Sequence, residues 1–149
     1  MDIRTEVRDW LSKVDWDTEL TLTFSNAVSE HQAEAAIRKF WNKVDWTLYG
    51  NAVIRFNKRC LRANMLQGDG KVVHYHFHCL SKRPSDRFST VTAYCDFLRE
   101  QWLETNHNNF AITIEPIRNK KGYTHYVSRQ VGRDNCDAFS IHSSHIAAH

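Results

Sequence analysis

The most informative stretch of the sequence is KVVHYHFHCL, residues 71–80. Its residues alternate in character, as in a β-strand, where successive side chains point to opposite faces of a sheet. One row is apolar and suited to a protein core: Val73, Tyr75, Phe77 and Cys79. The other row consists of three imidazoles: His74, His76 and His78. The segment therefore predicts a strand that is buried on one face and carries histidines on the other.

Such a row of histidines is suited to binding a metal ion. Two imidazoles at i and i+2 on one face of a strand can both reach a single divalent cation. The third histidine would then be an outer ligand or a phosphate contact. Two histidines are too few for a structural zinc site, which needs four ligands. Gln67, across the turn at 68–70, can supply an amide oxygen as a further ligand. A mixed nitrogen and oxygen shell with open positions favours Mn²⁺ or Mg²⁺ bound to a phosphate.

Before and after this strand, helical and extended patterns alternate. We expect helices over 3–12, from 29 to about 44, over 86–104 and over 122–131. We expect strands over 19–25, 51–62, 63–67, 71–81 and 110–116. Ser29 and Gln32 form a capping box, and the apolar residues that follow at helical spacing mark a buried face: Ala33, Ile37, Phe40, Trp41 and Val44. This order predicts an α+β fold, a central antiparallel sheet with flanking helices in a ferredoxin-like, split βαβ arrangement.

The bulk properties indicate a single domain spanning residues 1–149. The chain has five glycines and two prolines, with no linker-like stretch. Residues 1–17 are expected to form an N-terminal helical extension, and the small, polar tail 137–149 is expected to be disordered. The four cysteines form no CxxC pair, which indicates apolar packing in a reducing compartment. Without a signal-peptide pattern or an apolar run of about 20 residues, we expect a cytoplasmic protein.

Three elements, taken in order, resemble the HUH endonuclease domain of rolling-circle replication initiators of plasmids and single-stranded DNA phages. TLTF at 21–24 resembles the first motif, an early central strand. HFH at 76–78, followed by Arg83-Pro84, resembles the HUH motif. YVSR at 126–129 resembles the tyrosine motif, YxxK. The resemblance covers about residues 18–132, and the three motifs in this order are more specific than any one alone.

By this resemblance, His76, His78 and Gln67 are the expected ligands of Mn²⁺ or Mg²⁺. His74-Tyr-His76 would also match the HUH pattern, but the distance to Arg83-Pro84 favours His76 and His78. His74 is then a possible outer ligand. The position of Gln67 is often Glu in relatives, and a neutral amide would leave the bound ion more positive.

The resemblance also implies the reaction. Tyr126 would attack a scissile phosphodiester, release a 3′-hydroxyl and form a 5′-phosphotyrosine, which a free 3′-hydroxyl can later reverse. Arg129 replaces the usual lysine one helical turn away, and would stabilise the phenolate or the phosphate. Tyr123, three residues before Tyr126, is the alternative nucleophile. The expected activity is metal-dependent nicking and joining of single-stranded DNA to initiate rolling-circle replication, with a covalent protein–DNA linkage.

Two basic stretches are candidates for contacts with DNA phosphates: Arg55, Lys58, Arg59 and Arg62, and Lys120 and Lys121. The net charge of +3 fits such a partner without requiring it. The expected partners are single-stranded origin DNA folded as a hairpin, a separate helicase and the host polymerase, and no membrane.

Three other classes of function stay open on the sequence. A single-tyrosine HUH transposase has the same motif order, whereas relaxases typically carry the tyrosine before the histidines. A ferredoxin-like nucleic-acid-binding module with an incidental histidine strand would have no catalytic tyrosine. A metal-dependent hydrolase without a covalent step would form no protein–DNA adduct.

Overall fold

The computed structural model describes residues 3–24, 26–105, 112–118, 139–140 and 143–146 of the chain. After α1 (Ile3–Ser12), the elements follow in the order β1 (Thr18–Leu22), α2 (Glu30–Tyr49), α3 (Ala52–Phe56), β2 (Arg62–Gln67), β3 (His76–Ser81), α4 (Val91–Thr105) and β4 (Ile112–Pro116). The strands form a sheet of order β2-β3-β1-β4, in which every neighbouring pair is antiparallel. This is the predicted α+β fold, and its βαββαβ order matches a ferredoxin-like topology.

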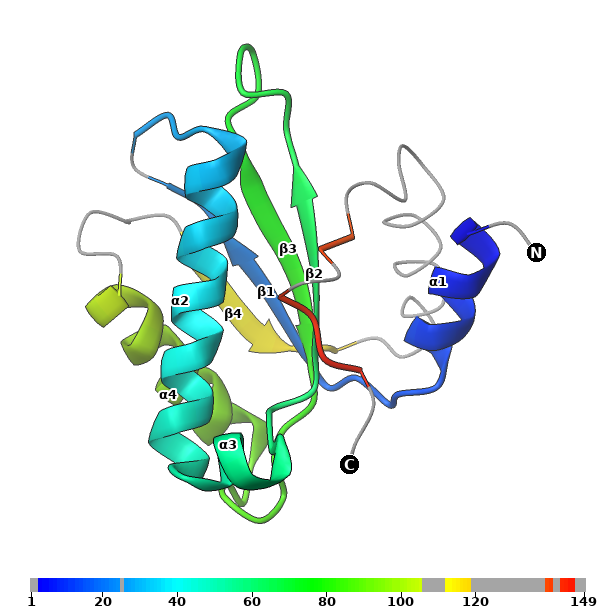
Figure 1. The fold of residues 1–149 in the computed structure, drawn as a ribbon, viewed down its shortest axis with the longest axis vertical. Coiled ribbons are helices and arrows are strands. Elements are labelled where there is room, and N and C mark those ends of the chain that lie inside the picture. Colours follow the sequence, from blue (N-terminus) through cyan, green and yellow to red (C-terminus); the bar gives the residue numbers. More distant parts are fainter. Residues whose placement is uncertain (1–2, 25, 106–111, 119–138, 141–142, 147–149) are drawn as a thin grey trace.

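The sheet separates two apolar layers. Figure 1 shows α2 and α4 over one face of the sheet and α1 on the other side. Under α2 and α4, Leu20, Phe77 and Cys79 join a large cluster that includes three fully buried aromatic residues of these helices: Phe40, Trp41 and Trp102. On the face of α1, the smaller cluster contains Leu11, Val14, Trp16, Ala63, Met65 and Leu80. The apolar cluster on the face of α2 and α4 is therefore larger than the cluster on the face of α1.

The long helix α2 follows the predicted pattern. The Ser29 hydroxyl accepts from the backbone N–H of Gln32, and the Gln32 side chain accepts from the backbone N–H of Ser29, so the capping box is confirmed. The predicted buried face is confirmed at every position. The helix continues to Tyr49, five residues beyond the predicted end near Val44, and stops at Gly50, which has a positive φ of 53°.

One predicted element and several predicted boundaries are wrong. Residues 52–56 form the short helix α3 and a loop leads from it to β2 at Arg62, where we expected a strand over 51–62. The histidine strand begins at His76 instead of Lys71, and α4 begins at Val91 rather than Asp86. For β3 and α4, hydrophobic spacing located the element but not its first residue.

Residues 68–75 form the turn between β2 and β3. The Asp69 carboxylate accepts the backbone N–H groups of Lys71, Val72 and Val73, the first of which contributes most to a lowered pKa of Asp69. Val73, predicted to lie in the core, is 51% exposed, because the strand starts only after it. The turn therefore satisfies its own backbone and leaves valine side chains in solvent.

The C-terminal segment lies along the outer edge of β2. Arg62 and His145 exchange backbone hydrogen bonds of 2.7 and 2.8 Å, and the Ser140 N–H donates to the Asn64 carbonyl at 2.8 Å. Residues 139–140 and 143–146 are therefore ordered against the sheet, where we had expected a disordered tail. They pair with part of a strand edge that would otherwise be open.

Within the described residues, no helix combines the length and the apolar character that crossing a membrane requires. The three cysteines that the structure describes, Cys60, Cys79 and Cys95, are buried free thiols, as predicted. Burial raises the pKa of the Cys60 thiol to about 12, which makes it a poor nucleophile at neutral pH. The fourth, Cys136, lies outside the described residues.

Candidate metal centre on the histidine face

The histidines of β3 alternate with buried residues, as the sequence predicted. Phe77 and Cys79 are fully buried under α2 and α4, whereas His76 and His78 are half-buried on the opposite face. The two imidazole rings lie 5.2 Å apart between centroids, with an interplanar angle of 77°. β3 is a central strand of the sheet, so the backbone that carries these rings is held on both sides.

Neighbouring strands place further polar groups beside the histidines. Directly opposed residues of antiparallel strands project to the same face. Gln67 of β2 is directly opposite His76, and Thr21 of β1 is directly opposite His78. The structure thus brings together the three predicted ligands, His76, His78 and Gln67, on one face at one end of the β2–β3 pair.

His74 occupies a different place from the predicted one. It precedes β3 and is exposed, and its backbone carbonyl contacts His76. The Nδ1 atom of His76 lies 3.0 Å from this carbonyl oxygen. Because a carbonyl only accepts, this hydrogen bond is formed when Nδ1 of His76 carries a proton, and in the neutral imidazole the Nε2 atom then has the lone pair that a metal ion needs.

Thr21 is a contact that the sequence reasoning missed. Its hydroxyl lies 3.4 Å from Nδ1 of His78. Metal-binding histidines typically have the second ring nitrogen held by a hydrogen-bonding partner, which fixes the orientation of the ring. The alternation of Glu19–Ser25 could have identified Thr21 as a residue of the polar face, but not its partner, because strand order was unknown.

A pair of carboxyl groups also lies on this face. Glu19 of β1 and Glu115 of β4 are directly opposed, one row along the sheet from Thr21. Burial, a hydrogen bond with Glu115 and the charge of Glu115 together raise the pKa of Glu19 above its usual value. The two carboxyl groups therefore favour sharing a proton, and sequence alone gave no sign that they meet.

The acidic residues do not complete a ligand set with the histidines. Among the described residues, no group of three or more histidine, cysteine, aspartate or glutamate side chains is placed to hold a metal ion. A site at His76 and His78 must therefore draw on an amide or hydroxyl oxygen, or on residues outside the described ranges. Gln67 meets the first requirement by its position.

Arg83 of the Arg83-Pro84 pair holds a loop. Its backbone N–H donates to the Asp17 carboxylate at 2.9 Å, and its guanidinium donates to the carbonyl of Phe88. This arginine is anchored at the end of β3 away from His76.

The first basic stretch, which we expected on strands near the histidine strand, does not lie on the histidine face. Arg55 is in α3, and Lys58 forms an ion pair of 3.3 Å with Asp86. Arg62 is directly opposite Ser81, so it points to the face of α2, and its side chain is 5% exposed. Arg59 precedes β2 and is partly exposed. These residues are therefore remote from the histidine face.

The predicted tyrosine helix lies outside the described residues. This applies to Tyr126 and Arg129, to the alternative nucleophile Tyr123, and to Lys120 and Lys121. Their roles stay predictions from the sequence.

No family model, no curated protein and no solved structure matches the chain. The histidine face presents two imidazoles, with the Gln67 amide directly opposite His76 and the Thr21 hydroxyl directly opposite His78.

Proposed function

We propose that the chain is a metal-dependent nickase that cuts and rejoins single-stranded DNA through a tyrosine nucleophile, as in the initiation of rolling-circle replication. One observation carries the proposal. His76 and His78 project from a central strand onto one half-buried face, with Gln67 directly opposite the first and Thr21 directly opposite the second. The order of the TLTF, HFH and YVSR motifs supports the same interpretation.

The residues present fit a divalent ion. The His74 carbonyl sets the tautomer of His76 that leaves Nε2 as a ligand, and the Thr21 hydroxyl lies at Nδ1 of His78. Gln67 would add a neutral oxygen, which suits Mn²⁺ or Mg²⁺ and leaves positions open for a phosphate. When bound, such an ion would polarise the scissile phosphate and offset the charge that develops on its non-bridging oxygens.

The protein's own groups would carry the covalent step. The phenolate oxygen of Tyr126 would form a bond to phosphorus as the bond from phosphorus to the 3′-oxygen breaks. The leaving oxygen would take a proton and become a 3′-hydroxyl, and the phosphate would stay as a 5′-phosphotyrosine. Arg129, one turn further along the predicted helix, would stabilise the phenolate before attack. Reversal by a 3′-hydroxyl would rejoin the strand.

The decisive experiment looks for the covalent intermediate. The protein is incubated with Mn²⁺ and a mixture of single-stranded oligonucleotides that can form hairpins, and products are separated on a denaturing gel. We expect a slow, protease-sensitive protein–DNA band that EDTA abolishes. Tyr126→Phe should lose this band and Tyr123→Phe should keep it.

Each other result points to a different function. Cleavage without an adduct would indicate a metal-dependent hydrolase. DNA binding that needs neither tyrosine nor metal would indicate a non-catalytic nucleic-acid-binding module. An adduct formed only on transposon-end hairpins, and not on replication-origin hairpins, would indicate a transposase. The first two results would overturn the proposal, and the third would replace replication by transposition.

A further inference from the structure

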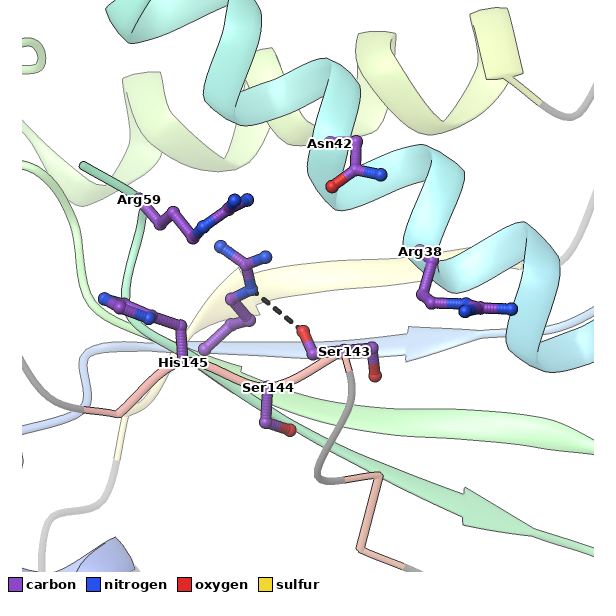
Figure 2. A pocket seen from close by; sticks show the side chains of 7 residues that line it. Arg38, Asn42, Arg59, Ser143, Ser144 and His145 are labelled. Carbon is purple, nitrogen blue, oxygen red and sulfur yellow. Dashed lines mark hydrogen bonds between the residues drawn. The ribbon is translucent and has the colours of Figure 1, made fainter. Parts of the chain in front are cut away.

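A second polar site lies on the opposite face of the sheet. A pocket of about 330 Å³ is lined by Arg38 and Asn42 of α2, by Arg59 and Arg62 at the start of β2, and by residues 143–145 of the C-terminal segment. Figure 2 shows Arg38 and Asn42 on the helix above it, Arg59 at one end, and Ser143, Ser144 and His145 below. Every side chain that lines it is polar or charged.

Arg62 is a fixed cation in this pocket. Its guanidinium lies 2.9 Å from the buried Asp45 carboxylate, donates from Nε to the Ser143 carbonyl at 3.0 Å, and lies 5.3 Å from the centre of the Trp41 ring. These contacts hold the arginine in place and connect β2 to the C-terminal segment. The Asp45 carboxylate partly neutralises its positive charge. A ligand would therefore depend more on the other two arginines of the pocket, Arg38 and Arg59.

Arg38 and Arg59 are the cations that can engage a ligand. Arg38 is exposed on α2 and makes no hydrogen bond or ion pair within the described part of the chain. Arg59 donates to the side chain of Asn57 at 2.8 Å and lies 3.5 Å from Asp45, at the limit of a hydrogen bond. The carboxylate of Glu34, one turn before Arg38, accepts from the Ser140 hydroxyl at 2.8 Å.

The charges and donors match an anion. The three arginines carry three positive charges against the two negative charges of Asp45 and Glu34, which leaves a net positive charge before any contribution from His145. Guanidinium groups bind phosphate oxygens through paired N–H donors, and amide and hydroxyl groups can complete the shell. The volume is at the small end of the range for ligand sites, about 300–1,000 Å³.

We propose that this pocket binds a phosphate group, supplied either by free phosphate or a nucleotide, or by the backbone of single-stranded DNA. The site is independent of the nickase proposal, because Arg62 and His76 are at opposite ends of the β2–β3 pair and on opposite faces. Along the strand these ends are separated by about 16 Å, from a rise of about 3.3 Å per residue.

Isothermal titration calorimetry with sodium phosphate, without divalent metal and against sodium chloride at equal ionic strength, tests the site. We expect saturable phosphate binding to the wild-type protein. Arg38→Gln should weaken it at least about tenfold, because a charge-assisted pair is lost. Lys39→Gln is the matched control: it removes the same charge from the adjacent exposed position of α2, which does not line the pocket, and should bind like wild type.

Two further measurements distinguish the sources of phosphate. In fluorescence anisotropy with a single-stranded oligonucleotide, weaker DNA binding by Arg38→Gln but not by Lys39→Gln would identify backbone phosphate. Unchanged DNA binding would identify free phosphate or a nucleotide. His76→Ala should still bind phosphate, whether or not the nickase proposal holds. Absence of phosphate binding above the chloride control, or equal affinity of Arg38→Gln and Lys39→Gln, would overturn the proposal.

Discussion

The β2–β3 hairpin has two unlike ends. At one end, the side chains of Arg62 and Asp45 are 5% and 0% exposed and form an ion pair of 2.9 Å, with the C-terminal segment over them. At the other end, His76 and Gln67 are directly opposed and only half-buried, beside a solvent-exposed turn. Both ends carry polar groups on the same two strands, but the first is closed and the second is open.

This difference separates a charge that the fold itself requires, that of Arg62, from side chains that are available to a metal ion, those of His76 and Gln67. A buried charge needs a permanent partner, because leaving it without one costs several kcal/mol. A half-buried imidazole can keep one nitrogen for a hydrogen bond within the protein and present the other to a ligand. We therefore expect changes at the closed end to reduce stability, and changes at the open end to reduce metal binding and activity at nearly constant stability.

The largest effect should come from Arg62→Met at the closed end. The buried Asp45 carboxylate would lose its main partner, and we expect the free energy of unfolding to fall by about 3–5 kcal/mol at pH 7, measured by urea denaturation. Burial raises the pKa of Asp45, and Arg62 partly offsets this rise, so the variant should have a still higher pKa. Its loss of stability should be complete above that folded pKa and shrink as the pH falls through it, because the carboxyl then takes up a proton.

Arg59→Met is the control for this prediction. The Arg59 side chain is 29% exposed and lies 3.5 Å from the same carboxylate, so its loss should cost less than about 1 kcal/mol. Equal losses in both variants would show that the closed end does not depend on the buried ion pair.

His76→Ala should have the next largest effect, on activity rather than stability. With one ligand removed, we expect formation of the DNA adduct to slow by at least about 100-fold, because the bound ion contributes several kcal/mol to such reactions. The midpoint of urea denaturation should stay close to that of wild type. His74→Ala keeps the backbone carbonyl that contacts His76, so adduct formation close to the wild-type rate would support the assignment of the ligands.

Gly68→Ala should disturb the open end through the turn. Gly68 has a φ of +106°, and an added Cβ would lie 2.5 Å from the His74 carbonyl oxygen, the group that sets the tautomer of His76. We expect a loss of stability of about 1–3 kcal/mol, together with weaker Mn²⁺ binding in calorimetry.

Gly50→Ala provides the comparison for Gly68→Ala. Gly50 also has a positive φ, of +53°, but a Cβ there would have nothing within 4 Å, and it lies at the end of α2. It should lose stability without any change in Mn²⁺ affinity. Reduced Mn²⁺ affinity in both variants would mean that the turn does not control the site.

Glu19→Gln, one row along the sheet from Thr21 at the limit of the open face, should have the smallest effect. Because its pKa is raised above 4.5 in the folded state, Glu19 contributes stability fully below pH 4.5 and loses it as the pH rises through the folded pKa. The amide can donate to Glu115 at any pH. We therefore expect the variant to match wild type below pH 4.5 and to be more stable above it, by less than about 1 kcal/mol in thermal unfolding at several pH values. A variant that is less stable at neutral pH would contradict the shared proton.

The sequence predicted those parts of the fold that depend on local periodicity. Hydrophobic spacing identified the face of α2 down to single residues, and alternation separated Phe77 and Cys79 from His76 and His78. It did not locate the first residues of β3 and α4. Those depend on how the preceding turns satisfy their backbone, such as the N–H groups that Asp69 accepts.

An α+β domain that contains a strand with histidines on one face and core residues on the other could be predicted from the residues alone. The contacts across strands became known only from the folded chain: Gln67 with His76, Thr21 with His78, and Glu19 with Glu115. The folded chain also showed that Arg62 faces Asp45 and the C-terminal segment rather than the histidines. The physical reason is that side-chain alternation is set within one strand, whereas strand order and register depend on packing between segments far apart in the chain.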